Sequence, residues 1–328
     1  MNGKVTSICA LLLLFAACSH VTSPSKDAGW RPFGSGLPET TTVKALTSDA
    51  SGTVCLAGTV DGVFILDAGG VWRPANNGLE ARDISCLAVH PHNNSIFFAG
   101  TWGKGVWRSA DGGASWKYVW KSEMNPLINH LAVAADGLVL AATEHGLYVS
   151  NDQGSSWQAA YAYGKIYTAA VHPLNPQLIV FGARWRGSFA STDQGRTWVS
   201  INEGVYRNEQ EIAAGQSFYF FNDHADHWLM STDYTGLYET FDAGKTWRLK
   251  AADAFSEALV EIAGTYDGKQ LWAITKSGSV YTCRDGRSWS LTNTGLGDAK
   301  AKSLYVLPTT KNAALIGTVG KGVFQWTD

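Results

Sequence analysis

Short apolar runs recur along the chain and are separated by turns rich in glycine, proline and asparagine. In one stretch the runs cover residues 84–90, 95–101 and 105–109, with polar turns between them. Runs of this length that contain β-branched and aromatic residues are typical of strands joined by hairpins. The pattern therefore predicts many short antiparallel strands.

A tryptophan recurs every 41 to 49 residues, in the series Trp30, Trp72, Trp116, Trp157, Trp198, Trp247 and Trp289. Four of these end octets of the form Ser/Thr-x-Asp-x-Gly-x-Ser/Thr-Trp, at 109–116, 150–157, 191–198 and 240–247. Two weaker copies exist: the copy from Asp67 to Trp72 lacks the leading serine, and the copy at 282–289 has Arg284 where the aspartate belongs. The chain therefore contains an internal repeat.

Three strand-like runs precede each octet, and the tryptophan opens a fourth strand. Four strands in a period of about 43 residues are typical of a propeller blade. Trp30 stands before the first complete set of three runs, whereas the last period ends after 322–326 without a fourth run. We therefore predict an all-β, seven-bladed β-propeller with four antiparallel strands per blade, in which the N-terminal strand closes the last blade. A six-bladed ring is the alternative.

The octet resembles the Asp-box, or BNR, repeat of sialidases, sortilin-type receptors and xyloglucan-degrading enzymes, over residues 30–328. Its residue types have local physical reasons. The carboxylate accepts backbone N–H bonds across a tight turn, glycine supplies a positive φ, and tryptophan packs between neighbouring sheets. We therefore interpret the box aspartates as structural; they are Asp67, Asp111, Asp152, Asp193 and Asp242.

The N-terminus has the features of an export signal. Residues 1–17 contain Lys4 and then an apolar run that is too short to span a bilayer, and they end in two alanines before Cys18. Leu-Phe-Ala-Ala-Cys resembles a bacterial lipobox, which implies lipidation of Cys18; ordinary secretion is the alternative. Ser19 resembles outer-membrane sorting signals.

These features divide the chain into a signal peptide (1–17), a lipidated cysteine with its tether (18–29) and the propeller (30–328). The eleven tether residues after Cys18 reach at most about 40 Å. We expect a cell-envelope protein, anchored in the outer membrane and facing the periplasm or the surface. A soluble periplasmic or secreted protein is the alternative.

Composition removes several classes. The 328 residues carry 26 basic and 28 acidic side chains, a net charge of −2, which lacks the basic excess of a nucleic-acid-binding protein. A hydrophobic content of 45% excludes a disordered chain.

Three cysteines, Cys55, Cys86 and Cys283, remain once Cys9 and Cys18 are assigned to the export signal. We expect all three to be buried free thiols; a disulfide between Cys55 and Cys86 is the alternative. The sequence contains no metal spacing, phosphate loop or dinucleotide fingerprint, so neither a metal nor a cofactor is predicted.

Charged and aromatic residues gather in the turns between second and third strands, which in propellers of this kind lie on the ligand-binding face. The predicted ligand-binding residues are Trp102, Lys104, Glu144, His145, Arg184, Trp185, Arg186, Tyr234, Lys276 and Lys321. They suggest a site for a polar or anionic ligand, with Trp102, Trp185 and Tyr234 as stacking platforms. The alternative is an ordinary polar rim. The segment 184–186 is the strongest element, because two guanidinium groups flank an indole.

Catalysis has weaker support. The resemblance to sialidases implies three arginines from different blades, a Tyr/Glu pair and an Arg-Ile-Pro motif, and these are not evident. Another glycosidase would need two carboxylates roughly 5 to 10 Å apart. Asp61, Glu144 and Asp233 are the candidate acids, although acids beside glycine usually form turns. Xyloglucan-degrading enzymes also use a cleft between two propellers, whereas this chain is predicted to contain a single propeller.

The fifth period is the longest. Its extra segment, 202–211, is either a partner-binding loop or an insertion without function. The turn at 222–227 contains two histidines and two aspartates, but its predicted place among the Asp-box turns favours a simple turn over a metal site.

We therefore predict a non-catalytic, membrane-anchored propeller that binds a protein, peptide or glycan and no nucleic acid. It is similar in this respect to sortilin-type domains and to photosystem II assembly-factor propellers, although the arginine patch of the latter is not evident. A glycoside hydrolase or lyase is the alternative.

Overall fold

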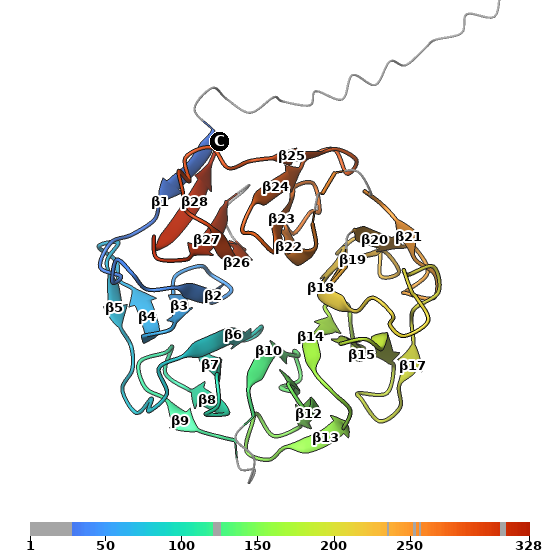
Figure 1. Ribbon diagram of the computed structural model, residues 1–328. Helices are drawn as coiled ribbons and strands as arrows, with labels where there is room; N and C mark the ends of the chain where they lie inside the picture. The colour runs from blue at the N-terminus through green and yellow to red at the C-terminus, as the bar shows by residue number, and fades with distance from the viewer. Residues whose placement is uncertain (1–27, 121–125, 235, 252–253, 256, 309–312) are drawn as a thin grey trace, which may run out of the picture.

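The computed structural model describes residues 28–328 except 121–125, 235, 252–253, 256 and 309–312. Seven four-stranded antiparallel sheets stand around a central axis (Figure 1). The predicted all-β, seven-bladed propeller is therefore confirmed. The described residues contain no helix that is long and apolar enough to cross a membrane. The predicted signal peptide and Cys18 lie outside the described residues.

Within each blade the chain runs from the axis to the circumference. Blade one contains β2 (Val43–Ser48), β3 (Cys55–Thr59), β4 (Gly62–Leu66) and β5 (Trp72–Pro74). Blade two contains β6 (Ile84–His90), β7 (Asn93–Thr101), β8 (Val106–Ser109) and β9 (Lys117–Tyr118). Blade three contains β10 (Ile128–Val133), β11 (Val139–Thr143), β12 (Gly146–Ser150) and β13 (Gln158–Tyr161). Blade four contains β14 (Ile166–His172), β15 (Asn175–Ala183), β16 (Gly187–Ser191) and β17 (Val199–Ser200).

The remaining blades follow the same order. Blade five contains β18 (Gly215–Phe220), β19 (Trp228–Thr232), β20 (Leu237–Thr240) and β21 (Arg248–Leu249). Blade six contains β22 (Leu259–Gly264), β23 (Leu271–Thr275), β24 (Val280–Cys283) and β25 (Trp289–Leu291). Blade seven contains β26 (Ala301–Val306), β27 (Ala314–Thr318), β28 (Val323–Thr327) and, from the other end of the chain, β1 (Gly29–Pro32).

The ring closes where β1 pairs with β28, beside each other in Figure 1. The register places Trp30 opposite Trp326, and the two rings meet edge to face with centroids 5.4 Å apart. This pairing covers the edge of β28 that would otherwise be open. The prediction that the N-terminal strand completes the last blade is confirmed.

Every innermost strand carries a β-bulge close to its first residue. In each of the seven first-to-second strand pairs, the register advances by two residues on the inner strand and by one on its partner. The extra residues are Lys44, Ser85, Asn129, Tyr167, Gln216, Val260 and Lys302. A bulge leaves its extra residue outside the ladder and redirects its side chain. All of these residues except Lys302 line a cavity of about 220 Å³ between the inner strands, where Ser85 and Asn129 also donate to backbone carbonyls of the next blade.

A glycine lies opposite the bulge in several blades and lets neighbouring blades approach. At Gly182 in β15, an added Cβ would lie 1.9 Å from the carbonyl oxygen of Gly215 in the next blade. Any side chain at this position would therefore separate blades four and five. The glycine excess reflects close packing inside strands as well as turns.

The box aspartates hold the turns between third and fourth strands. In blade three, Asp152 accepts hydrogen bonds from the Ser156 amide at 2.8 Å and from the Ser156 hydroxyl at 2.7 Å, and Ser150 donates to the same carboxylate at 2.7 Å. The Ser156 hydroxyl, together with the amides of the turn, lowers the pKa of Asp152 to about 2. The hydrogen bonds of the turn therefore favour the ionised form of the carboxylate.

The sixth blade shows a variant of this turn. Arg284 occupies the expected aspartate position, and Asp285, one residue later, accepts the amides of Arg287 at 2.8 Å and Ser288 at 2.7 Å. Arg284 instead pairs with Asp328. The turn keeps its anionic acceptor although the octet pattern is broken.

The repeated tryptophans join each blade to the one before it. Six indole N–H groups donate to a backbone carbonyl at or just after the fourth strand of the preceding blade: Trp30 to Thr292, Trp72 to Phe33, Trp116 to Ala75, Trp157 to Val119, Trp198 to Ala160 and Trp247 to Ile201, over 2.7 to 3.0 Å. Trp289 differs, because its buried indole nitrogen has no hydrogen-bond partner among the described residues. Six of the seven repeats thus share one interblade bond.

The cysteines Cys55, Cys86 and Cys283 are buried and free. Burial raises the pKa of Cys86 to about 12, as expected for a thiol in an apolar core. The free-thiol interpretation holds, and the alternative Cys55–Cys86 disulfide is wrong.

The interblade bond can be tested with a matched pair of variants. Trp247→Phe removes the donor to the Ile201 carbonyl, whereas Trp289→Phe removes the same atoms where no bond exists. We expect Trp247→Phe to lose about 1–3 kcal/mol more unfolding free energy than Trp289→Phe, because it leaves a buried carbonyl unpaired. Urea unfolding monitored by circular dichroism measures the difference. Equal losses would assign the effect to ring volume alone.

Candidate functional site

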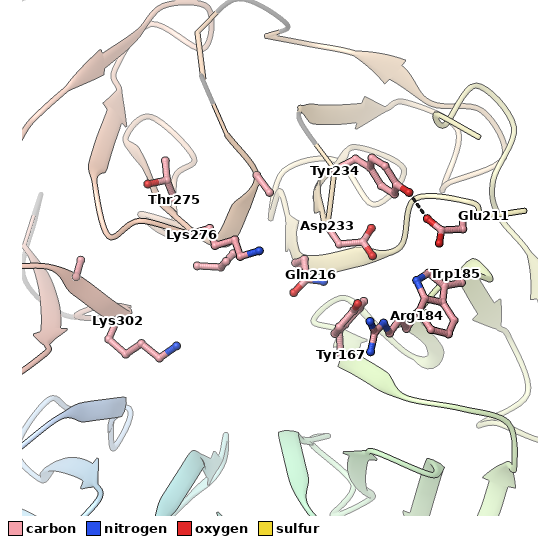
Figure 2. Close-up of a pocket in the computed structure, with 13 residues that line it drawn as sticks. Tyr167, Arg184, Trp185, Glu211, Gln216, Asp233, Tyr234, Thr275, Lys276 and Lys302 are labelled. Atoms are coloured by element: carbon pink, nitrogen blue, oxygen red, sulfur yellow. Dashed lines mark hydrogen bonds between the residues drawn. The ribbon is translucent and has the colours of Figure 1, made fainter. Parts of the chain in front are cut away.

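One face of the propeller carries the turns between second and third strands and the loops that join blades; we call it the front face. A cavity of about 470 Å³ opens on this face across blades four to seven. Figure 2 shows its polar side chains: Tyr167, Arg184, Trp185, Glu211, Gln216, Asp233, Tyr234, Thr275, Lys276 and Lys302. This volume lies within the usual range of small-molecule sites.

Arg184 and Trp185 come from the turn between β15 and β16. Trp185 has φ +65°, a left-handed conformation that is rare for a bulky residue, and its side chain is 52% exposed. The Arg184 guanidinium lies over the indole, 4.1 Å from the ring centroid. Strained residues are concentrated at binding sites, where the surrounding structure holds them. The turn presents a flat aromatic surface backed by a cation.

The long loop before blade five forms one wall of the cavity. Its Ile212 amide donates to the Trp185 carbonyl at 3.1 Å, which fixes the loop to the neighbouring turn. Glu211 accepts a hydrogen bond from the Tyr234 hydroxyl, and this bond raises the pKa of Tyr234 to about 12. Tyr206, from the same loop, packs against Tyr234 with ring centroids 5.0 Å apart. The extra segment of the fifth period therefore contributes directly to the cavity.

Asp233 directly follows β19 and accepts a hydrogen bond from the Ala214 amide at 2.8 Å. Burial raises the pKa of Asp233, and burial together with the nearby Asp233 charge raises the pKa of Tyr167 to about 12. Two carboxylates, those of Asp233 and Glu211, thus line the same cavity.

The charged groups of the cavity are not paired with one another. Outside it, three cations of the front face are paired, Lys165 with Glu144 at 2.7 Å, Lys44 with Asp83 at 2.5 Å and Lys321 with Asp298 at 3.6 Å. Lys104 and Arg186, also outside it, form no ion pair with the described residues. Inside it, Arg184, Lys276 and Lys302 form no ion pair with the described residues, and neither do Asp233 and Glu211. The cavity therefore holds unlike charges that do not neutralise one another.

The structure brings together some of the predicted ligand-binding and catalytic residues. Arg184, Trp185, Asp233, Tyr234 and Lys276 line the cavity. The other predicted residues, Asp61, Trp102, Lys104, Glu144, His145, Arg186 and Lys321, lie outside it. Of the three candidate catalytic acids, only Asp233 reaches the cavity.

Five polar lining residues were not among the site residues predicted from the sequence. Tyr167, Gln216 and Lys302 occupy bulges of inner strands, Glu211 belongs to the long loop, and Thr275 ends β23. A signal for the bulges exists, because a polar residue follows the first residue of the inner strand in every period except the sixth, where Val260 stands.

The side chains of the histidine-rich turn at 222–227 do not converge as metal ligands would. No group of three or more histidine, cysteine, aspartate or glutamate side chains in the described part of the chain is placed to hold a metal ion. His227 instead stacks between Phe221 and Phe241, with centroids 3.8 and 4.3 Å away, and contacts Glu239 at 2.9 Å. The turn therefore has a packing role at the rim.

Comparison with known proteins supports the fold alone. No protein-family model matches the chain, and no curated protein matches it. Among solved structures, a GH74 xyloglucanase from Xanthomonas campestris shares 17% identity over 91% of this chain, with a TM-score of 0.70. The chain spans 53% of that enzyme.

Two further structures have similar rings. YCF48 from Cyanidioschyzon merolae shares 16% identity with a TM-score of 0.67, over 91% of this chain and 98% of that protein. The extracellular domain of the two-component system BT4673 from B. thetaiotaomicron shares 16% identity with a TM-score of 0.71, over 91% of this chain and 39% of that one. The propeller fold of this chain is thus similar to that of a xyloglucanase, of YCF48 and of the extracellular domain of a two-component system.

The strained tryptophan gives a stability prediction. Trp185→Gly should leave the protein at least as stable as the wild type, because glycine adopts a positive φ without strain. Trp102→Gly is the matched control: Trp102 is 51% exposed in the equivalent turn of blade two, without a positive φ. There, glycine should cost about 0.5–1 kcal/mol. Thermal unfolding compares the two, and a larger loss for Trp185→Gly would contradict the strain argument.

Proposed function

We propose that the protein is an exported, lipid-anchored propeller that binds a protein, peptide or glycan in the front-face cavity, without catalysis. The observation that carries this proposal is the gathering of Arg184, Lys276 and Lys302, from three blades and without ion pairs among the described residues, beside the exposed Trp185. Unpaired cations in a concave site attract anionic groups, and an indole face stacks on sugar or peptide surfaces.

The proposed location depends on the N-terminal sequence. The apolar run before Cys18 and the polar tether up to Gly29 support export and anchoring at the cell envelope, with the propeller facing the periplasm or the surface. A structure of YCF48 bound to D1 peptide, which shares 16% identity with this chain and a TM-score of 0.68, supports peptide binding by a ring of this shape.

The binding site is tested by a double variant. Arg184→Ala with Trp185→Ala should abolish capture of the native partner from crosslinked membranes, because it removes both the cation and the aromatic platform. Its thermal stability should stay unchanged, since both side chains lie on an exposed turn. Trp102→Ala with Lys104→Ala, on the same face in blade two, is the control and should capture normally. Equal capture by both double variants would refute this site.

Hydrolysis of a glycan is a second candidate, because Asp233 and Glu211 line the same cavity and burial raises the pKa of Asp233. A glycoside hydrolase uses one carboxyl group as an acid and another as a base or nucleophile. In this case the wild type should release reducing ends from xyloglucan or another plant or bacterial glycan. Asp233→Asn and Glu211→Gln should each lower that rate by at least about 100-fold. A rate unaffected by either change would exclude these acids.

A further inference from the structure

One side of the cavity carries only lysines, and the other carries two carboxylates and an arginine. In Figure 2, Lys276 and Lys302 extend from blades six and seven, whereas Asp233 and Glu211 lie across the opening at blade five, with Arg184 near them. Elsewhere on this face some unlike charges form ion pairs, as Lys165 and Glu144 do at 2.7 Å. No such pair links the two sides of the cavity within the described residues.

The two carboxylates each accept a hydrogen bond from a neutral donor. Tyr234 donates to Glu211, and the Ala214 amide donates to Asp233. Each of these carboxylates keeps lone pairs for further donors, because a carboxylate accepts about four hydrogen bonds. The carboxylates are therefore positioned acceptors that form no ion pair with the described residues.

A ligand with a single kind of charge would leave one side unsatisfied. An anion near Lys276 and Lys302 would place the rest of its structure against two carboxylates, and a cation near Asp233 would face the lysines. The cavity holds three cations and two carboxylates, 3 − 2 = +1 when all are ionised. This balance suits a ligand with separated charges and a net charge of zero or −1.

We infer that the ligand is dipolar: its carboxylate or phosphate lies against Lys276 and Lys302, and its ammonium group lies against Asp233 and Glu211. This inference rests on the proposed binding function and names its ligand chemistry. Peptides with a free amino terminus and amino-sugar acids both carry this arrangement. The cavity of about 470 Å³ suits a group of either kind.

The experiment compares probes that differ only in charge. The peptide probes are Gly-Gly-Asp, its N-acetyl form, which is anionic only, and Gly-Gly-Asn-amide, which is cationic only. Muramic acid and N-acetylmuramic acid are the sugar counterparts. Titrations are followed by isothermal calorimetry and by the indole N–H signals of the full-length protein. We expect at least about tenfold tighter binding of one dipolar probe than of its blocked forms, and the better class identifies the source.

Variants assign the two ends of the ligand. Lys276→Gln with Lys302→Gln should lower the affinity for the dipolar probe to that for the cationic probe. Glu211→Gln with Asp233→Asn should lower it to that for the anionic probe, and the asparagine can still accept the Ala214 amide. Lys321→Gln, on the same face outside the cavity, is the control and should bind as the wild type does.

The outcomes separate this inference from the proposed function. Equal binding of acetylated and free probes would overturn the dipolar ligand and leave an anion-binding propeller. Failure of every probe would also overturn it, while partner capture that depends on Arg184 and Trp185 would still support the binding function. Failure of both measurements would remove both proposals.

Discussion

Closure of the ring by two strands from opposite ends of the chain is the constraint on which the rest of the molecule depends. Each blade packs against two neighbours, so an open ring would expose the inner faces of blades one and seven. At the seam, Trp30 pairs with Trp326 through the strand register and also donates its indole N–H to Thr292 of blade six. The cavity requires this closure, because Lys302 reaches it from the blade that β1 completes.

Much of the architecture could be predicted from the sequence, because every blade repeats the same local sequence pattern. A tryptophan every 41 to 49 residues corresponds to the start of a fourth strand, and an octet corresponds to one turn, so their number predicts the number of blades. The placement of the turns between second and third strands on one face followed instead from the resemblance to propellers of this kind. Five of the residues predicted there, among them Arg184, Asp233 and Lys276, meet in the cavity.

Other features could not be predicted, because they depend on strand register and on hydrogen bonds that the sequence pattern does not reveal. A bulge changes which side chains face the channel, so the repeat pattern alone does not single out Tyr167 or Lys302 as lining residues. In the sixth blade Asp285 replaces the missing aspartate one position later, a change that looks like loss until the hydrogen bonds are seen. Glu211 lies in a loop whose path depends on the backbone bond between Ile212 and Trp185.

At the seven bulges, the residues that pair the strands differ from the residues whose side chains lie outside the strand ladder. A bulged residue lies outside the strand ladder, so its side chain can change without altering the hydrogen-bonded pairing of the sheet. Some of these side chains also join neighbouring blades, since Ser85 and Asn129 each donate to a backbone carbonyl of the next blade. Gln216, Val260 and Lys302 show how varied the other positions are within one ring. Substitutions at such positions can give the channel mouth a new ligand preference while the pairing of the strands stays the same.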